Sequence, residues 1–383
     1  MSAMAAIDGG RLVQRLAMLC AADTQNPPGH EARAALPLAE ELRRLGFDVA
    51  LPEVFPGRPN LIATLANGAG PRFAFNTHHD VVPAGEGWTT PPFAPAIRDG
   101  KLFARGACDA KGSMAAMVEA CAALAADRAA WSGTLIAAFV VDEEVASAGA
   151  RAYAATRPAL DLAVVGEPTN NSVFIAHKGS LRPVVRIKGR TAHSGTPHLG
   201  RNAILDAARF LLLVERLGAE IAARPGHPLL GGASLTVTRA AAGLADNIVP
   251  DSCELLLDRR MLPGETEDAA VAEIEELFAV AGIEAEVIAR KPTTGGPVAT
   301  PPDHPLVRAA LQIARHHGAR AEAPQGFPGA CDLVHMAAAG AAGLILGPGA
   351  LAVAHQPDEH VPLDELHAAA NIYRDLALAM MPA

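Results

Sequence analysis

Residues 133–144 read GTLIAAFVVDEE, an apolar run that ends in three carboxylates. Similar runs, rich in Val, Ile, Leu and Phe, occur at RFAFNTHHDVV (72–82), DLAVVGEP (161–168) and AAGLILGPG (341–349). Continuous apolar runs of this length are typical of strands that are buried on both faces. Helical stretches such as KGSMAAMVEACAALAAD (111–127) separate them. The pattern predicts an α/β fold with a mostly parallel central sheet flanked by helices.

The segment 179–290 has a different pattern, in which strands and helices follow the order βαββαβ. This is the split βαβ arrangement of a small ferredoxin-like domain. Regular secondary structure is expected to break on either side of this segment, at AHKGS (176–180) and KPTTGGP (291–297). We therefore expect one domain made of residues 1–178 and 291–383, with residues 179–290 inserted into it. The expected strands are 180–189, 233–240, 252–261 and 283–289, and the expected helices are 202–224 and 266–282.

Length and composition exclude several classes of protein. The chain has 383 residues, of which 50% are hydrophobic, so a folded globular protein is expected. The net charge of -9 and the scattered basic residues argue against a nucleic-acid or anionic-membrane surface, and favour a small-molecule partner. Charges interrupt every apolar stretch too early for a membrane span or a signal peptide, so we expect a cytoplasmic protein. Five cysteines without a C-x-x-C pair predict reduced thiols.

The stretch AFNTHHDVVP (74–83) places two adjacent histidines after an apolar run. Side chains alternate along a strand, so His78 and Asp80 share one face and His79 points to the other. We interpret His78 as the candidate metal ligand. A carboxylate such as Asp80 commonly accepts the second N–H of a metal-bound imidazole. The alternative is a polar strand end with ordinary hydrogen bonds.

Carboxylates follow two other segments. Asp109, in GACDAKG, stands at an expected helix N-terminus, where the alternative role is an N-cap. Asp142, Glu143 and Glu144 follow the apolar run 133–141, and three like charges there repel one another unless a positive charge lies among them. A solvated acidic loop is the alternative to a metal site.

Glu167 and His355 follow the last two apolar runs. In open α/β sheets ligands bind at the carboxyl ends of the strands, so all these polar residues are expected at one edge. Two histidines with several carboxylates favour zinc or cobalt. Five ligands exceed the need of one tetrahedral zinc, so the set predicts two ions that share Asp109, roughly 3.5 to 4 Å apart, an arrangement suited to hydrolysis. The ligands are His78, Asp109, one of Glu143 or Glu144, Glu167 and His355.

Other activities have weaker support. GPGALA (347–352) has the spacing of a dinucleotide-binding loop, which would indicate an oxidoreductase, but Pro348 interrupts it and Pro357 stops any following helix. The sequence has no G-x-S-x-G, so a serine nucleophile is unsupported. In a non-catalytic binding protein, a spare carboxylate beside two metals would have no purpose.

Together these residues closely resemble the cocatalytic zinc family of aminoacylases and carboxypeptidases, which includes acetylornithine deacetylase and succinyl-diaminopimelate desuccinylase. The family's blocks recur in order over nearly the whole chain, among them THHDVVPAGEGW, DEE, GEPT and GRTAHSGTPHLGRNAI. The resemblance implies a metal-dependent hydrolase with two divalent ions, zinc or cobalt, and a cis peptide bond between Asp109 and Ala110. The implied roles are His78 and Glu167 on one ion, Glu144 and His355 on the other, Asp109 between them, Asp80 orienting His78, and Glu143 as general base.

The resemblance also assigns roles to the inserted segment, which would be a lid and dimerisation domain. His193 in TAHSGTP matches a histidine that reaches the oxyanion from the partner subunit, which implies a homodimer. Asn247 and Arg259 match positions that contact substrate, the arginine through the substrate carboxylate. The alternatives are a strand-end cap for Asn247 and a surface ion pair between Asp258 and Arg259.

The stretches GEPTNNSVFIAHKG (166–179) and GPGALAVAHQPDE (347–359) are most similar to acetylornithine deacetylases. The resemblance therefore implies removal of an N-acyl group from an amino acid. PGACDL (328–333) departs from the deacetylase pattern, so we expect Asp332 to contact a different end of the substrate. A succinyl-diaminopimelate desuccinylase and a small metallo-carboxypeptidase or dipeptidase are the alternatives.

Overall fold

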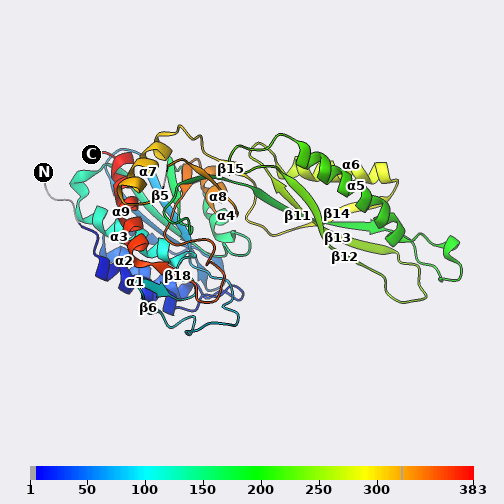
Figure 1. The fold of residues 1–383 in the computed structure, drawn as a ribbon, viewed down its shortest axis with the longest axis horizontal. Helices are drawn as coiled ribbons and strands as arrows, with labels where there is room; N and C mark the ends of the chain where they lie inside the picture. Colours follow the sequence, from blue (N-terminus) through cyan, green and yellow to red (C-terminus); the bar gives the residue numbers. More distant parts are fainter. Residues whose placement is uncertain (1–5, 321) are drawn as a thin grey trace. The chain divides into compact units, whose positions relative to one another are not determined.

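The computed structural model describes residues 6–320 and 322–383, which form two compact units. The first unit comprises the described residues up to Ile175, together with Thr300–Phe327 and Cys331–Ala383. The inserted unit comprises Ala176–Ala299 and Pro328–Ala330. Each unit has its own sheet and its own helices (Figure 1).

Four parallel strands form the centre of the large sheet in the first unit. β5 (Arg72–His78) pairs in parallel with β8 (Gly133–Val140) and with β9 (Leu162–Val165), and β17 (Ala342–Ile345) pairs in parallel with β9. These strands are almost entirely buried, as their continuous apolar sequences predict. The predicted α/β class with a largely parallel central sheet is therefore confirmed.

Further strands extend this sheet at both edges, and β4 and β10 pair antiparallel with β8 and β17. Its order is β1-β4-β8-β5-β9-β17-β10-β15, and β16 pairs with β10. The added strands are β1 (Asp48–Ala50), β4 (Leu61–Asn67), β10 (Phe174–His177), β15 (Val298–Ala299) and β16 (Gln325–Phe327).

Helices cover both faces of the sheet (Figure 1). α3 (Lys111–Ala126) is buried along almost its whole length, and it packs against β5 and β8 as well as α1 and α9. A separate pair of short helices, α4 (Ala148–Ala155) and α8 (Leu333–Ala338), lies on the opposite side of β5 from α9. The remaining helices are α1 (Gly9–Ala21), α2 (Ala32–Arg44), α7 (Pro305–His316) and α9 (Leu363–Met380).

Two small sheets connect loop segments of the first unit. β18 (His360–Pro362) pairs with β7 (Lys101–Phe103), which also pairs with β6 (Ala96–Arg98), while β2 (Glu53–Phe55) pairs with β3 (Arg58–Pro59). The pairing of β18 with β7 brings the segment after His355 close to the segment that leads to Asp109.

The inserted unit has the predicted βαββαβ order. Its antiparallel sheet has the strand order β12-β13-β11-β14, which is the ferredoxin-like order. Apolar residues of the sheet and helices, such as Val185, Phe210, Leu255 and Ile274, form its core. The elements are β11 (Gly179–Lys188), α5 (Ala203–Ala223), β12 (Ser234–Ala242), β13 (Ser252–Met261), α6 (Glu267–Ala281) and β14 (Glu284–Lys291).

Two further observations concern the expectations from composition. All five cysteines are free, as predicted, and all five are buried. No helix within residues 6–320 and 322–383 is both long enough and apolar enough to cross a membrane.

Candidate metal centre

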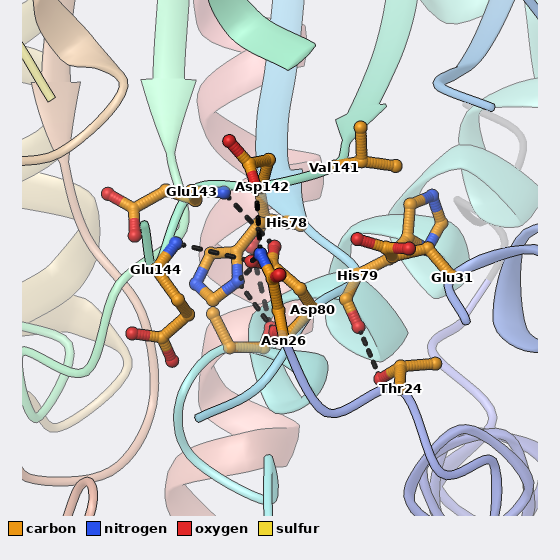
Figure 2. A network of polar contacts seen from close by, with 12 residues as sticks. Thr24, Asn26, Glu31, His78, His79, Asp80, Val141, Asp142, Glu143 and Glu144 are labelled. Carbon is orange, nitrogen blue, oxygen red and sulfur yellow. Dashed lines mark hydrogen bonds and ion pairs between the residues drawn. The ribbon is translucent and has the colours of Figure 1, made fainter. Parts of the chain in front are cut away.

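The predicted polar residues meet at the carboxyl ends of the parallel strands. His78 ends β5 and lies opposite Val140 of β8, so the acidic residues after β8 are its neighbours. His79 points away from this cluster (Figure 2) and packs edge-on against Phe139, with 6.2 Å between the ring centroids. Burial lowers the pKa of His79 to about 3, so its ring is neutral. The strand alternation therefore separates the two histidines as predicted.

Asp109 lies between two histidines. Its Oδ1 is 3.3 Å from Nε2 of His78, and its Oδ2 is 3.2 Å from Nε2 of His355. The alternative role as an N-cap is wrong, because Ala110 occupies the N-cap position of α3. The Asp109–Ala110 peptide bond is cis, as the resemblance implies. Asp109 is thus placed to present one oxygen to each of two cations.

His355 contacts a second carboxylate through the same ring nitrogen. Nε2 of His355 is 3.1 Å from Oε2 of Glu144, in addition to its contact with Asp109. A single ring N–H cannot donate fully to two carboxylates, whereas one cation can bind all three groups. The backbone of His355 has a φ of 63°, which is uncommon for a residue other than glycine.

Two sets of possible ligand atoms lie within 4.8 Å of one another: His78 with Asp109 and Glu144, and His78 with Glu143 and Glu167. Ligands about 2.0 to 2.1 Å from a tetrahedral zinc are roughly 3.3 Å apart, close to the separations around Asp109. In addition, Oε1 of Glu144 and Oε1 of Glu167 are buried and accept no hydrogen bond from any residue that the structure describes. This donor set fits two divalent ions.

The electrostatics of the cluster favour added positive charge. Burial, followed by repulsion from Glu167, raises the pKa of Glu143 well above its ordinary value, and burial likewise raises that of Glu167. Burial and the charge of Asp109 raise the pKa of Glu144 to about 7. Hydrogen bonds to Asp109 and Glu144 raise the pKa of His355 to about 10. Without metal the cluster therefore retains protons, and bound cations would take their place.

Asp80 contacts more of the site than its position beside His78 predicts. Nδ1 of His78 is 2.9 Å from the backbone carbonyl oxygen of Asp80 and 3.5 Å from its carboxylate. The carboxylate accepts hydrogen bonds from the backbone N–H groups of Glu143 (3.1 Å) and Glu144 (3.3 Å). Asp80 therefore holds the acidic loop after β8 as well as the ring of His78.

Glu359 supports the loop that carries Asp109, and sequence reasoning missed it. It is fully buried, and its Oε1 accepts hydrogen bonds from the backbone N–H groups of Cys108 (3.0 Å) and Asp109 (3.1 Å). Arg105 pairs with its other oxygen at 2.6 Å. Glu359 follows His355 closely in the sequence, but no spacing rule indicates that its side chain turns back to residues 108 and 109.

Asp332 belongs to the first unit and lies at the N-terminus of α8. It is buried, and its carboxylate oxygens accept no hydrogen bond from the described part of the chain. Burial raises its pKa to about 6. After the effects of burial and of nearer charges, the charge of Asp332 also raises the pKa values of Glu143 and Glu167. The nearby Ser147 hydroxyl opposes the rise in the pKa of Asp332, so Asp332 is a buried acid with few polar partners beside the candidate metal ligands.

His193, Asn247 and Arg259 lie in the inserted unit. The loops of the first two are paired, because the N–H of Ser194 donates to the carbonyl of Asn247 at 2.9 Å, and both side chains are exposed. Arg259 is buried on β13 and pairs with Glu265. The alternative of an Asp258–Arg259 ion pair is wrong: side chains alternate along β13, and Asp258 pairs with Arg182 (3.0 Å) and Arg260 (2.7 Å) on the opposite face.

Comparison with known proteins agrees with this geometry. Residues 74–379 match peptidase family M20/M25/M40. The chain is 33% identical over 358 residues to succinyl-diaminopimelate desuccinylase of Stenotrophomonas maltophilia, covering 88% of this chain and 91% of that protein. It is 32% identical over 362 residues to acetylornithine deacetylase of Proteus mirabilis, covering 90% and 89% of the two chains.

A solved structure has the same fold. The Bacillus subtilis YXEP protein, described as a dinuclear metal-binding peptidase, superposes with a TM-score of 0.70 at 19% identity and covers 97% of this chain and 98% of its own. The resemblance seen in the sequence is confirmed by the family match and by relatives above 30% identity. The chain therefore belongs to peptidase family M20/M25/M40 and is an amide-bond hydrolase.

Proposed function

We propose that this enzyme removes an N-acyl group from an amino acid, as acetylornithine deacetylase does, with two divalent metal ions as cofactors. One observation carries the proposal: Asp109 presents separate oxygens to His78 and His355, while Glu143 lies in the same cluster. Two ions could share this aspartate and leave the Glu143 carboxylate free for proton transfer. The relatives named acetylornithine deacetylase and succinyl-diaminopimelate desuccinylase support an acylated amino acid as substrate.

The donor geometry and the family pattern support the proposed ligand roles. His78 and Glu167 would hold one ion, Glu144 and His355 the other, and Asp109 would bridge them. Nitrogen and carboxylate ligands together favour zinc, with cobalt as a substitute. When bound, the ions would polarise the amide carbonyl and lower the pKa of the attacking water.

Proton transfer is assigned to Glu143. Its carboxylate takes a proton from the attacking water and later donates it to the leaving nitrogen. The backbone N–H of Glu143 donates to Asp80 at 3.1 Å, which supports this role because it fixes the backbone that carries the Glu143 carboxylate. His193 would stabilise the oxyanion.

Substrate contacts are proposed for Asn247, Arg259 and Asp332. Arg259 is paired with Glu265 in this structure, so it would have to exchange that partner for the substrate carboxylate. Asp332 has two unpaired oxygens beside the cluster, so it can accept hydrogen bonds from a donor group of the substrate. A substrate with a free amino group is therefore favoured.

We further propose that the inserted unit serves as a lid and a dimerisation domain, and that the enzyme is a cytoplasmic homodimer. β12 is an edge strand of its sheet, and α5 exposes Leu205 (60%) and Leu212 (59%) to solvent. An open strand edge beside exposed apolar side chains is a common contact between subunits.

Amine release from a panel of N-acetyl amino acids, N-succinyl amino acids and dipeptides would test the function. The protein would be treated with a chelator and then supplied with zinc or cobalt. We expect metal-restored hydrolysis, fastest on N-acetyl substrates that have a second amino group. Metal-restored hydrolysis of N-succinyl substrates alone would favour the second candidate, a succinyl-diaminopimelate desuccinylase, which the relative of that name supports. Preference for dipeptides would indicate a small metallo-carboxypeptidase or dipeptidase.

A further inference from the structure

Asn26 lies in the loop after α1, far in sequence from every candidate ligand. The loop is bound along the residues that follow β5. The N–H of Asn26 donates to the carbonyl of Val81 at 2.9 Å, the N–H of Val81 donates to the carbonyl of Thr24 at 3.2 Å, and the Thr24 hydroxyl donates to the carbonyl of His79 at 2.7 Å. This short ladder holds Asn26 beside Asp80.

The side chain of Asn26 joins the two segments that carry the acidic and histidine ligands. Its Nδ2 donates to Oδ2 of Asp80 at 2.9 Å and to Oδ1 of Asp142 at 2.9 Å. Asn26 is only 5% exposed, so water cannot readily replace these bonds. Figure 2 shows the amide between the two carboxylates, with Glu143 and Glu144 on the adjoining backbone. Both amide hydrogens are therefore committed to acids of the site.

The two carboxylates need such a donor because they are buried and carry like charge. Asp80 is fully buried and Asp142 is 5% exposed, so their repulsion is poorly screened. Arg58 contributes positive charge on the far side, with its Nη2 3.3 Å from Oδ1 of Asp142 and in an ion pair with Glu31. Arg58 does not reach Asp80 through any hydrogen bond or ion pair among the described residues, whereas Asn26 bonds to both aspartates.

The backbone conformation of Asp142 is a second reason why this loop needs the hydrogen bonds from Asn26. The φ of Asp142 is 69°, in the left-handed region that a residue with a side chain seldom adopts. The next two backbone N–H groups, of Glu143 and Glu144, donate to Asp80. The loop thus has two fixed points, the Asp142 side chain and the Asp80 carboxylate, and Asn26 connects them.

We propose that Asn26 is a positioning residue for the metal centre. By linking Asp80 to Asp142, it sets the orientation of His78 and the placement of the Glu143–Glu144 loop. This inference rests on the proposed function and deepens it, because it names a residue that acts on the ligands and the base through Asp80. Residues that support metal ligands in this way typically change metal affinity or activity by about 10- to 100-fold when substituted.

The test compares Asn26→Asp with Asn67→Asp. Both substitutions keep the shape of the side chain, remove the two N–H donors and add a negative charge. Asn67, the last residue of β4, also donates two hydrogen bonds from Nδ2, to the carbonyls of Arg128 (2.6 Å) and Trp131 (2.6 Å). It therefore controls for the general loss of a doubly bonded asparagine. The measurements are thermal unfolding of the metal-free protein, zinc affinity, the absorption spectrum of the cobalt-loaded protein, and kcat and KM.

We expect Asn26→Asp to weaken zinc binding about 10- to 100-fold, to change the cobalt spectrum and to lower kcat more than it raises KM. Asn67→Asp should alter only the unfolding temperature. The inference is overturned if Asn26→Asp retains the native zinc affinity, cobalt spectrum and kcat. If that variant does not fold, Asn26→Ala is measured in the same way, and failure of both to fold would make Asn26 purely structural and would also overturn the inference.

The two metal measurements require no substrate. A native-like zinc affinity and cobalt spectrum in Asn26→Asp would therefore count against the inference even if the proposed deacylase activity were found. Conversely, an altered cobalt spectrum together with no hydrolysis of any substrate in the panel would support the inference and count against the proposed function.

Discussion

Glu143 is the residue whose loss should separate metal binding from catalysis. The proposed ligand roles leave its carboxylate unassigned to either ion, and its place in the cluster suits proton transfer. Glu143→Gln should therefore lower kcat by about 10²- to 10⁴-fold, the usual contribution of a general base, while the bound metal content stays unchanged. Steady-state kinetics and metal analysis of the same preparation would check this. Loss of one metal equivalent would instead identify Glu143 as a ligand.

The pKa shifts at the cluster predict how the stability of the metal-free protein depends on pH. Glu144 has a folded-state pKa of about 7 against an ordinary value of 4.5, and His355 has one of about 10 against 6.5. Both groups hold their protons more tightly in the folded state than in the unfolded state. A raised pKa gives stability that is lost as the pH rises, so both groups act in the same direction.

The free energy of unfolding of the chelated protein should accordingly fall as the pH rises from about 6.5 toward about 10, above the range in which the lowered pKa of His79 acts in the opposite direction. The part contributed by His355 is complete below its ordinary pKa of 6.5 and disappears as the pH passes its folded value of about 10. Denaturant unfolding at a series of pH values would measure the fall. The zinc-loaded protein should lack it, because bound ions replace the protons, and a parallel fall in both forms would contradict this explanation.

At the residue scale, the sequence was informative wherever a local rule applied. Strand alternation separates His78 from His79, and the convergence of strand ends brings Glu144 and Glu167 near His78. The sequence could not reveal the roles of Asn26 or Glu359, because these roles depend on loops that meet only in the folded chain. The order of Glu143 and Glu144 came from the family resemblance, since neighbouring glutamates on a loop follow no periodic rule.

At the element scale, α1, α2 and α3 are joined by a buried charge network rather than by apolar packing alone. Glu119 of α3 is fully buried and pairs with Arg11 (2.5 Å) and Arg15 (3.0 Å) of α1. Arg15 also pairs with Glu41 of α2 at 2.5 Å. Because the side chain of Arg15 is only 2% exposed, removal of Glu119 would leave a buried guanidinium without its inner partner.

Glu119→Ala should therefore lower the free energy of unfolding by about 3 to 5 kcal/mol, the usual cost of breaking a buried ion pair. The control is Glu40→Ala, which removes an exposed pair between Glu40 and Arg43 of α2 and should cost about 0 to 1 kcal/mol. Denaturant unfolding would measure both. Equal losses in the two variants would show that burial of the network adds no stability.

The elements themselves were largely predictable from the sequence. The parallel strands are continuous apolar runs, and the inserted unit alternates between helical and strand periodicity. The short strands β6, β7 and β18 were not predicted, because segments of three residues carry too little periodicity. Their pairing nevertheless brings the His355 and Asp109 loops together. A contact of the candidate site therefore depends on strands that are too short to predict from the sequence.

At the scale of the whole molecule, the proposed homodimer places exposed apolar residues of the inserted unit in an interface. Replacing both Leu205 and Leu212 by Asp should give a folded monomer, because charges on that face of α5 cannot be buried without partners. Light scattering would measure the mass, and circular dichroism would check the fold. Val280→Asp is the matched control, since Val280 is 70% exposed on the other helix of the same unit. An unchanged mass for the double variant would exclude α5 from any interface.

A sharper test asks whether His193 acts in the site of the partner subunit. His193→Ala and Glu143→Gln chains are each expected to be nearly inactive as homodimers. In a mixed dimer, the chain with an intact Glu143 would receive an intact His193 from its partner, which restores one site of two. Random mixing of equal amounts should recover about a quarter of the native activity, because half of the dimers are mixed. Adding the α5 double substitution to both chains should abolish the recovery. If the mixture stays inactive although mixed dimers form, His193 must act within its own chain or outside catalysis.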